Sequence, residues 1–175
     1  NLNPRRTGLL AVVERMGGRV RVEAGADIAG EPCGDLVVER ADVLHGTEVA
    51  PEEVPSLIDE LPLVGLLGAR AAGTTEVRGA AELRVKESDR IASVVRALRA
   101  LGAAAEERRD GFAVTGSPRL PGGEVDAGGD HRIAMLGAVA GLVSATGVSV
   151  TGFEAAGVSY PGFAADLASL GAART

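Results

Sequence analysis

The chain contains very few aromatic residues, with three Phe, one Tyr and no Trp among its 175 residues. The core must therefore consist of aliphatic side chains, and rows of aromatic rings that stack on nucleic-acid bases are excluded. The formal net charge is −6, so we expect neither nucleic acid nor an anionic membrane as the main partner. A local site for a small anion is compatible with this charge, because net charge does not describe a single pocket.

Cysteine and long apolar runs are equally scarce. The single cysteine, Cys33, excludes an internal disulfide and a zinc site built from several cysteines, and the two histidines lack regular ligand spacing. Gly, Pro or a charged residue interrupts each apolar stretch before it reaches the ~18 residues of a membrane-spanning helix. No secretory signal or glycine-rich phosphate-binding loop is visible. We therefore expect a cytoplasmic protein that uses no metal and no nucleotide cofactor.

The length and composition are typical of one packed domain. Hydrophobic residues make up 46% and charged residues 24%, which favours a folded, soluble domain over disorder. The first residue is Asn1, and residues 1–8 read like the interior of a longer sequence. We therefore expect residues 1–175 to be a single domain of something larger.

Internal repetition is the clearest sign of organisation. Three segments predict a helix that ends at a glycine, namely residues 7–18, 88–103 and 160–172. In the central copy the apolar residues fall on one helical face, and Gly102 stands where a left-handed C-cap belongs. These apolar residues are Ile91, Val94, Val95, Leu98 and Leu101.

A second unit alternates with the first and consists of an apolar helix, a glycine turn and a β-rich segment. Its two copies span residues 56–79 and 130–152, and they start roughly 70 residues apart, which suits a supersecondary unit better than a solenoid repeat. A hairpin turn at residues 109–111 separates predicted strands at 103–108 and 112–115. The sequence therefore predicts an α/β or α+β domain with internal pseudo-symmetry.

Two arginines stand at positions that a helix dipole disfavours. We expect Ser88 to cap a helix that follows a strand at residues 83–85, with Arg90 in its first turn. We expect Asp130 to cap a second helix, with Arg132 two residues later. Cations prefer helix C-termini, so an anion bound at these helix starts would remove the conflict, and two guanidinium forks suit a carboxylate or phosphate. The alternative is two solvated charges at helix ends, and the sequence leaves both interpretations open.

Asp59 and Glu60 interrupt an otherwise apolar segment at residues 55–62. One interpretation is an acidic first turn of a helix capped by Ser56. The other is a carboxylate at the mouth of a pocket, where desolvation raises its pKa and suits it to proton transfer. His131 lies within the second charged segment, and we expect it near a bound ligand.

These charged segments resemble the signature segments of the 5-enolpyruvylshikimate-3-phosphate (EPSP) synthase family. The match rests on Leu-Arg-Val-Lys-Glu-Ser-Asp-Arg at 83–90 and Asp-His-Arg-Ile-Ala-Met at 130–135. Segments 4–8, 55–60 and 159–163 match in the same order, so the resemblance covers nearly the whole chain. It implies two inside-out α/β domains of three βαβαββ units each, with pseudo-threefold symmetry and an active site between them. Residues 1–175 resemble the C-terminal domain, without the N-terminal domain.

The resemblance also implies a reaction. Members of this family transfer the enolpyruvyl group of phosphoenolpyruvate to the 5-hydroxyl of shikimate-3-phosphate and release phosphate, in aromatic amino-acid biosynthesis by the shikimate pathway. No metal or organic cofactor is implied. The implied partners are these two small-molecule substrates and the N-terminal domain.

Six residues correspond by position to substrate-binding and proton-transfer residues of the family: Asp59, Lys86, Glu87, Arg90, His131 and Arg132. The resemblance implies that Asp59 binds the shikimate ring and accepts the proton of the attacking hydroxyl. Lys86 is implied to hold the hydroxyl edge of this substrate, and Glu87 to handle the proton at the methylene carbon of phosphoenolpyruvate. The two arginines are implied to grip its carboxylate, with the histidine beside them. Glu82 and Val158 depart from the family pattern, and no role is carried over to them.

Two alternatives remain. A related enolpyruvyl transferase acts on UDP-N-acetylglucosamine and shares the fold, although the combined segments 86–90 and 130–132 favour the shikimate enzyme. The second alternative is a non-catalytic binding domain of the same fold. We expect this chain alone to bind either substrate weakly and to show no turnover, because the other domain supplies further contacts and excludes water on closure.

Overall fold

A computed structural model describes residues 1–170 of the chain. The helices are α1 (Gly8–Arg15), α2 (Leu61–Arg70), α3 (Arg90–Ala100), α4 (His131–Gly141), α5 (Ala156–Ser159) and α6 (Phe163–Ser169). Three 3₁₀ turns are η1 (Val54–Ser56), η2 (Ala81–Val85) and η3 (Phe153–Ala155). The strands are β1 (Arg19–Ala24), β2 (Gly34–Glu39), β3 (Glu48–Val49), β4 (Thr74–Val77), β5 (Ala104–Arg108), β6 (Gly111–Thr115), β7 (Gly123–Asp126) and β8 (Val148–Thr151).

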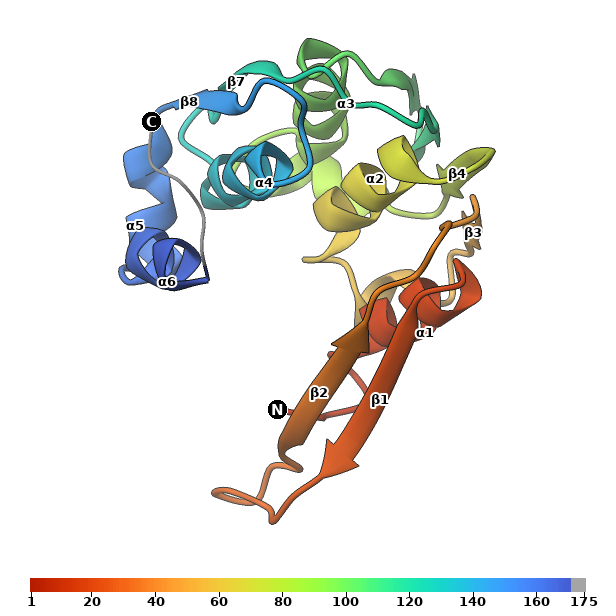
Figure 1. Cartoon of the computed structure of the whole chain (residues 1–175), viewed down its shortest axis with the longest axis vertical. Helices are drawn as coiled ribbons and strands as arrows, with labels where there is room; N and C mark the ends of the chain where they lie inside the picture. The colour runs from red at the N-terminus through yellow and green to blue at the C-terminus, as the bar shows by residue number, and fades with distance from the viewer. Residues whose placement is uncertain (171–175) are drawn as a thin grey trace.

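The strands form one four-stranded sheet and two strand pairs. In the sheet the order is β3-β4-β6-β5, where β3 and β4 are parallel and the remaining neighbours are antiparallel. The pair β1–β2 is an antiparallel hairpin, whereas β7 and β8 run parallel. Figure 1 shows the β1–β2 hairpin projecting from the body of the molecule, with α2, α3 and α4 grouped beside the other strands.

The element order repeats. From β3 to β6 the main elements are β3-α2-β4-α3-β5-β6, which is the order βαβαββ. The run β7-α4-β8-α6 repeats the first four elements of this unit, apart from the short η3 and α5, and the run α1-β1-β2 repeats its last three. The pairing repeats as well, since β7–β8 is parallel like β3–β4 and β1–β2 is antiparallel like β5–β6. The α/β fold of repeated units is therefore confirmed.

The core is aliphatic, as the composition requires. The five residues predicted on one face of the central helix are all buried: Ile91, Val94, Val95, Leu98 and Leu101. Each such side chain contributes about 1.5–3 kcal/mol on burial. Gly102 follows this helix with φ = +86°, the predicted left-handed conformation. Phe112, one of the few aromatic residues, completes the packing and is fully buried on β6.

Gly68 brings α2 close to the sheet. A Cβ atom at this position would lie 2.7 Å from the Cβ of Thr75 on β4, closer than real side-chain contacts allow. The helix therefore lies directly against the strand because residue 68 has no side chain. No helix within residues 1–170 has the length and apolar character needed to cross a membrane.

Several predicted elements are confirmed within a few residues of their bounds. The predicted helix at 7–18 is α1, and the hairpin strands at 103–108 and 112–115 are β5 and β6, with Arg108 opposite Gly111. The predicted helix at 160–172 is α6, which spans Phe163–Ser169, and residues 171 and 172 of that prediction lie outside the described residues.

The predicted strand at residues 83–85 is wrong, because this segment is the end of η2. Leu83 is fully buried and its N–H donates to the carbonyl of Ala80 at 2.9 Å, whereas Val85 is 80% exposed. The alternation of apolar and polar residues suggested a strand, but the two apolar side chains have opposite environments. In a 3₁₀ turn, Leu83 can point into the core while Val85 points to solvent.

Two predicted helix caps are also wrong. The carboxylate of Asp89 accepts the N–H of Ala92 at 3.1 Å, so Asp89 rather than Ser88 caps α3. Ser56 ends η1 and donates its hydroxyl to the carbonyl of Glu53 at 2.8 Å. Helix α2 begins only at Leu61, so the acidic residues at 59 and 60 precede the helix instead of forming its first turn.

Thr75 generates a stability prediction. Its side chain is fully buried, and its hydroxyl oxygen has no hydrogen-bond partner among the described residues. Because a buried unpaired hydroxyl costs about 1–3 kcal/mol, we predict that Thr75→Val raises the free energy of unfolding by about 1 kcal/mol. Urea denaturation followed by circular dichroism measures this change.

The neighbouring Thr74 provides the matched control. Its side chain is exposed and its hydroxyl pairs with that of Thr115 at 3.3 Å, so Thr74→Val should bring no stabilisation. A Thr75→Val variant that unfolds at a lower urea concentration than the parent chain would show that the hydroxyl stabilises the fold.

Candidate active site

The starts of α3 and α4 meet at the carboxylate of Asp130. This residue caps α4, since its Oδ1 accepts the N–H of Arg132 at 2.9 Å. Its Oδ2 accepts the hydroxyl of Ser88 at 2.8 Å and the Nε of Arg90 at 2.9 Å. The two charged segments, about 40 residues apart in the sequence, are therefore joined by one carboxylate, and the predicted cap at Asp130 is confirmed.

Arg90 and Asp130 form a buried ion pair. The side chain of Arg90 is 2% exposed and that of Asp130 is 0% exposed. Burial alone raises the pKa of Asp130, but hydrogen bonds from Arg90, Ser88 and the Arg132 N–H together hold that pKa below its ordinary value. Losing one member of such a pair leaves an uncompensated buried charge, which costs about 3–5 kcal/mol.

Three arginines surround Asp59. Its Oδ2 lies 3.1 Å from Nη2 of Arg132 and 3.2 Å from Nη2 of Arg6, and its Oδ1 lies 3.7 Å from Nη1 of Arg90. The Nη1 of Arg132 also donates to the backbone carbonyl of Asp59 at 3.1 Å. These contacts bind the segment before α2 to the start of α3 and to the start of α4.

Glu87 joins the same cluster through Nη2 of Arg90. Its Oε2 accepts a hydrogen bond from Nη2 of Arg90, and its side chain is 53% exposed. The guanidinium of Arg90 therefore contacts three carboxylates, those of Asp59, Glu87 and Asp130. Asp59 and Glu87 become neighbours of one buried cation although they lie 28 positions apart in the sequence.

The cations at the helix starts are offset by carboxylates of the chain itself. Solvated charges do not describe Arg90, because its side chain is buried, so that interpretation is wrong for this residue. Arg132 is 27% exposed and bound to Asp59, so it combines a fixed orientation with access to solvent. The unfavourable interaction with the helix dipole is therefore reduced by nearby negative charge.

Burial raises the pKa of Glu60, beside Asp59. Its pKa is raised above the ordinary value by desolvation and by the negative charge of Asp59, against the opposing effect of Arg132. The expected desolvated carboxyl in this segment therefore exists, at residue 60. A raised pKa keeps a carboxyl group closer to the protonation equilibrium that proton transfer requires.

Two of the expected site residues have less direct links to this cluster. The amino group of Lys86 pairs with the carboxylate of Glu82, four residues earlier. His131 is the first residue of α4 and is half-buried, directly between the cap Asp130 and Arg132. Both residues lie in the two charged segments that the cluster joins.

Sequence reasoning missed two features of the site. Arg6 contacts Asp59 from the segment before α1, and no periodicity or capping pattern marks it. Asp130 was expected to cap a helix, but its ion pair with Arg90 is a tertiary contact that no local pattern shows. The one local sign in the sequence is Arg132, a cation that stands in the first turn of a helix two residues after the acidic cap Asp130.

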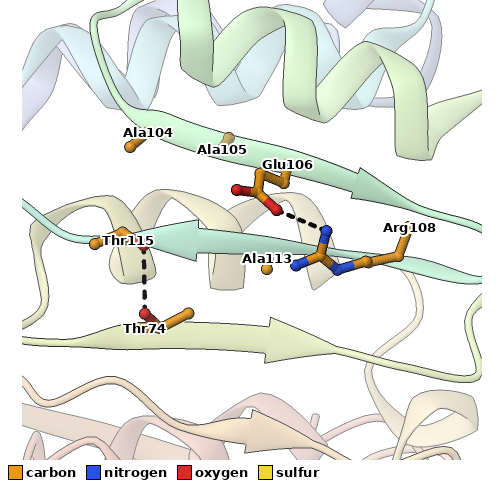
Figure 2. Close-up of a pocket in the computed structure, with 7 residues that line it drawn as sticks. All are labelled: Thr74, Ala104, Ala105, Glu106, Arg108, Ala113 and Thr115. Atoms are coloured by element: carbon orange, nitrogen blue, oxygen red, sulfur yellow. Dashed lines mark hydrogen bonds and ion pairs between the residues drawn. The ribbon is translucent and has the colours of Figure 1, made fainter.

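The structure also has a shallow cavity away from this cluster, and its lining makes it a poorer candidate for the active site. Figure 2 shows it on the face of the sheet formed by β4, β5 and β6, with a volume of about 350 Å³. Its charged residues, Glu106 and Arg108, pair with each other at 2.6 Å, and Thr74 pairs with Thr115. Nothing in this lining is positioned for chemistry. Within residues 1–170, no group of three or more His, Cys, Asp or Glu side chains is arranged to hold a metal ion.

The cluster can perform two kinds of chemistry. Guanidinium groups are planar and always charged, and they bind carboxylates or phosphates through paired hydrogen bonds. Carboxylates beside them can accept or donate protons while the arginines stabilise negative charge that develops nearby. The arrangement suits the addition of a nucleophile to a small anionic substrate.

Comparison with known sequences gives a consistent result. Residues 1–167 match the family described as EPSP synthase (3-phosphoshikimate 1-carboxyvinyltransferase). A 3-phosphoshikimate 1-carboxyvinyltransferase of Desulfitobacterium hafniense is 48% identical over 162 residues, which cover 93% of this chain and 37% of that protein. One from Synechococcus sp. (strain RCC307) is 47% identical over 169 residues, covering 97% of this chain and 38% of that protein. The chain therefore spans less than two fifths of the length of these relatives.

Solved structures agree with the sequences. EPSP synthase from Acinetobacter baumannii matches with a TM-score of 0.90 and 35% identity, over 97% of this chain and 39% of that chain. The enolpyruvyl transferase NikO from Streptomyces tendae matches with a TM-score of 0.71 and 26% identity, over 95% of this chain and 35% of that chain. With a family match over nearly all of its residues and relatives at almost half identity, this chain belongs to the EPSP synthase family.

Proposed function

We propose that this chain is the C-terminal domain of a two-domain enzyme of the shikimate pathway. This enzyme transfers the enolpyruvyl group of phosphoenolpyruvate to the 5-hydroxyl of shikimate-3-phosphate and releases phosphate. The observation that carries the proposal is the contact of Arg90 and Arg132 with Asp59, together with the contact between Arg90 and Glu87. Membership of the EPSP synthase family supports the choice of substrates.

The two arginines bind the carboxylate of phosphoenolpyruvate in this proposal. Arg132 is partly exposed, and both terminal nitrogens of its guanidinium contact Asp59, Nη1 the backbone carbonyl and Nη2 the carboxylate. Its fork is therefore oriented before substrate arrives. Arg90 is fixed by Asp130 from behind. Because both guanidinium groups are already ordered, little conformational entropy is lost when an anion binds to them.

The carboxylates handle the protons. The oxygen of the 5-hydroxyl attacks C2 of phosphoenolpyruvate and its proton passes to Asp59, while C3 gains a proton from Glu87 and becomes a methyl group. The resulting tetrahedral intermediate then loses phosphate from C2, and the departing phosphate oxygen takes up the proton held by Asp59. C3 returns a proton to Glu87, which restores the double bond in the product. Glu87 acts as acid and then as base in this proposal, and its partial exposure lets a bound substrate reach it.

Lys86 and His131 complete the substrate contacts. Lys86 binds the hydroxyl edge of shikimate-3-phosphate, and this contact competes with its ion pair to Glu82. His131 stands at the start of α4, where free backbone N–H groups and the helix dipole favour an anion.

In this proposal the rest of the full-length enzyme covers parts of this chain. One face of the β1–β2 hairpin carries cross-strand pairs of apolar residues, Val20 opposite Val38 and Val22 opposite Leu36. Val38 is 69% exposed, and Val22 and Leu36 are each close to half exposed. Exposed apolar faces of this kind mark contact surfaces. The coverage of less than two fifths of the relatives' length supports assigning this contact to the rest of a full-length enzyme.

The choice of acceptor tests the proposed function. The full-length protein that contains this chain is mixed with phosphoenolpyruvate and either shikimate-3-phosphate or UDP-N-acetylglucosamine, and the products are identified by mass spectrometry. We expect enolpyruvyl product and phosphate with shikimate-3-phosphate alone, and no turnover from the 175-residue chain by itself. Product from the UDP-sugar only would assign the related transferase. Binding without product would indicate a non-catalytic domain.

We predict that Arg132→Lys in the full-length enzyme raises the KM for phosphoenolpyruvate about tenfold, because one ammonium group cannot reproduce two parallel hydrogen bonds. Steady-state kinetics with varied phosphoenolpyruvate measures the change. Arg78→Lys is the matched control, since Arg78 pairs with Glu76 and Glu48 away from the site. An unchanged KM in Arg132→Lys would remove this residue from the carboxylate site.

We predict that Glu87→Gln lowers kcat about 100-fold with little change in either KM, because an amide keeps the hydrogen bond to Arg90 but cannot transfer the proton. Single-turnover kinetics separates the chemical step from binding. Glu106→Gln is the control, as Glu106 is exposed and pairs only with Arg108 among the described residues. An effect on KM alone would contradict the proton-transfer role.

A further inference from the structure

Lys86 and Glu87 lie in a short surface segment, residues 85–88, which runs from the last residue of η2 to the residue before the N-cap of α3. The segment bends without forming a regular helix beyond Val85, which is itself 80% exposed. Surface segments with few buried contacts open easily. The orientation of Lys86 and Glu87 therefore depends on the groups that hold the two ends of this segment.

Arg84 holds both ends. Its Nε donates to the carbonyl of Arg109 at 2.8 Å and its Nη2 to the carbonyl of Arg108 at 2.6 Å, at the turn between β5 and β6. Its Nη1 donates to the carboxylate of Asp89 at 2.8 Å, immediately after the segment, and to that of Glu107 on β5 at 2.9 Å. One guanidinium thus ties the residues before and after the segment to a rigid hairpin.

The anchor continues into the buried cluster. Asp89 also accepts the N–H of Ala92 and thereby caps α3, whose first residue is Arg90. Arg90 in turn donates to Glu87. Arg84 therefore pairs with Asp89 and Arg90 pairs with Glu87, while the Ser88 hydroxyl between them donates to Asp130. Arg84 is the contact that ties this segment to the β5–β6 hairpin.

Only arginine can make this set of contacts. Its three nitrogen atoms carry five N–H donors in a fixed plane, which here reach two carbonyls and two carboxylates. A lysine has a single nitrogen and cannot span these four acceptors. The side chain of Arg84 is 28% exposed, so water replaces part of what is lost on substitution.

We infer that Arg84 is a positioning residue of the active site, which holds the Lys86–Glu87 segment in its working conformation. The catalytic consequence rests on the proposed function, whereas the anchoring rests on the contacts of Arg84 alone. Arg90 keeps its own support from Asp130, so phosphoenolpyruvate binding does not depend on Arg84. Loss of Arg84 therefore affects proton transfer by Glu87 and acceptor binding by Lys86.

The first experiment uses Arg84→Met and Arg84→Lys in the full-length enzyme, with Arg78→Met as control. We expect kcat to fall about 30-fold in Arg84→Met, since a misplaced catalytic group costs up to about 100-fold per ångström. The KM for shikimate-3-phosphate should rise several-fold, and that for phosphoenolpyruvate should stay within about twofold. Arg84→Lys should recover less than about a third of the lost kcat, and Arg78→Met should match the parent enzyme.

The second experiment measures amide hydrogen exchange in the 175-residue chain. We expect residues 85–89 to exchange at least about tenfold faster in Arg84→Met, with α4 unchanged. This measurement tests the positioning role of Arg84 without relying on enzyme activity. If the parent enzyme shows no turnover with shikimate-3-phosphate, the proposed function is wrong, but faster exchange in Arg84→Met still shows that Arg84 holds the segment. Should Arg84→Met fail to fold, the same measurement on Arg84→Lys decides.

Two results overturn the inference. One is a kcat in Arg84→Met within about twofold of the parent enzyme. The other is a loss of activity that only follows the folded fraction, with exchange in residues 85–89 and α4 rising together, which would show a purely structural role.

Discussion

The ion pair between Arg90 and Asp130 is the contact on which the rest of the site depends. Both side chains are withdrawn from water, so each needs the other to remain charged at low cost. Because Asp130 also accepts the N–H of Arg132 and the hydroxyl of Ser88, one carboxylate fixes the starts of α3 and α4 against each other. Buried pairs of this kind often add little to stability. Their value here is geometric, since a shift of either helix would leave a charge without its partner.

Charge balance within the cluster follows from this constraint. Arg6, Arg90 and Arg132 face Asp59, Glu87 and Asp130, so the site is locally near neutral although the chain carries a net charge of −6. An incoming anion competes with Asp59 for guanidinium groups that are already oriented. Such preorganised dipoles and charges need little rearrangement when negative charge develops in a reaction.

The periodicity of apolar residues in the sequence predicted most helices and strands correctly. The residue types within each short segment did not predict which side chains meet in the folded chain. The helical face from Ile91 to Leu101 and the β5–β6 hairpin are repeated local patterns, and both are confirmed. The strand expected at 83–85 failed because three alternating residues cannot distinguish a strand from a 3₁₀ turn. Ser88 and Asp89 are both good caps, and the choice between them depends on the long-range bond from Ser88 to Asp130. Arg6 and Asp59 meet only through the tertiary fold, so no local pattern indicates their contact.

The repeated units explain why three helix starts converge. Helices α2, α3 and α4 follow β3, β4 and β7, each of which belongs to a parallel strand pair, and the three helices contact one another. In α/β folds the carboxyl ends of parallel strands and the helix starts beside them form the binding edge. Acidic residues precede each of these helices, at positions 59, 60, 89 and 130. Repetition thus supplies several helix starts at one edge, and an arginine follows the cap at two of them, where a guanidinium can meet an anion beside the free N–H groups of the helix.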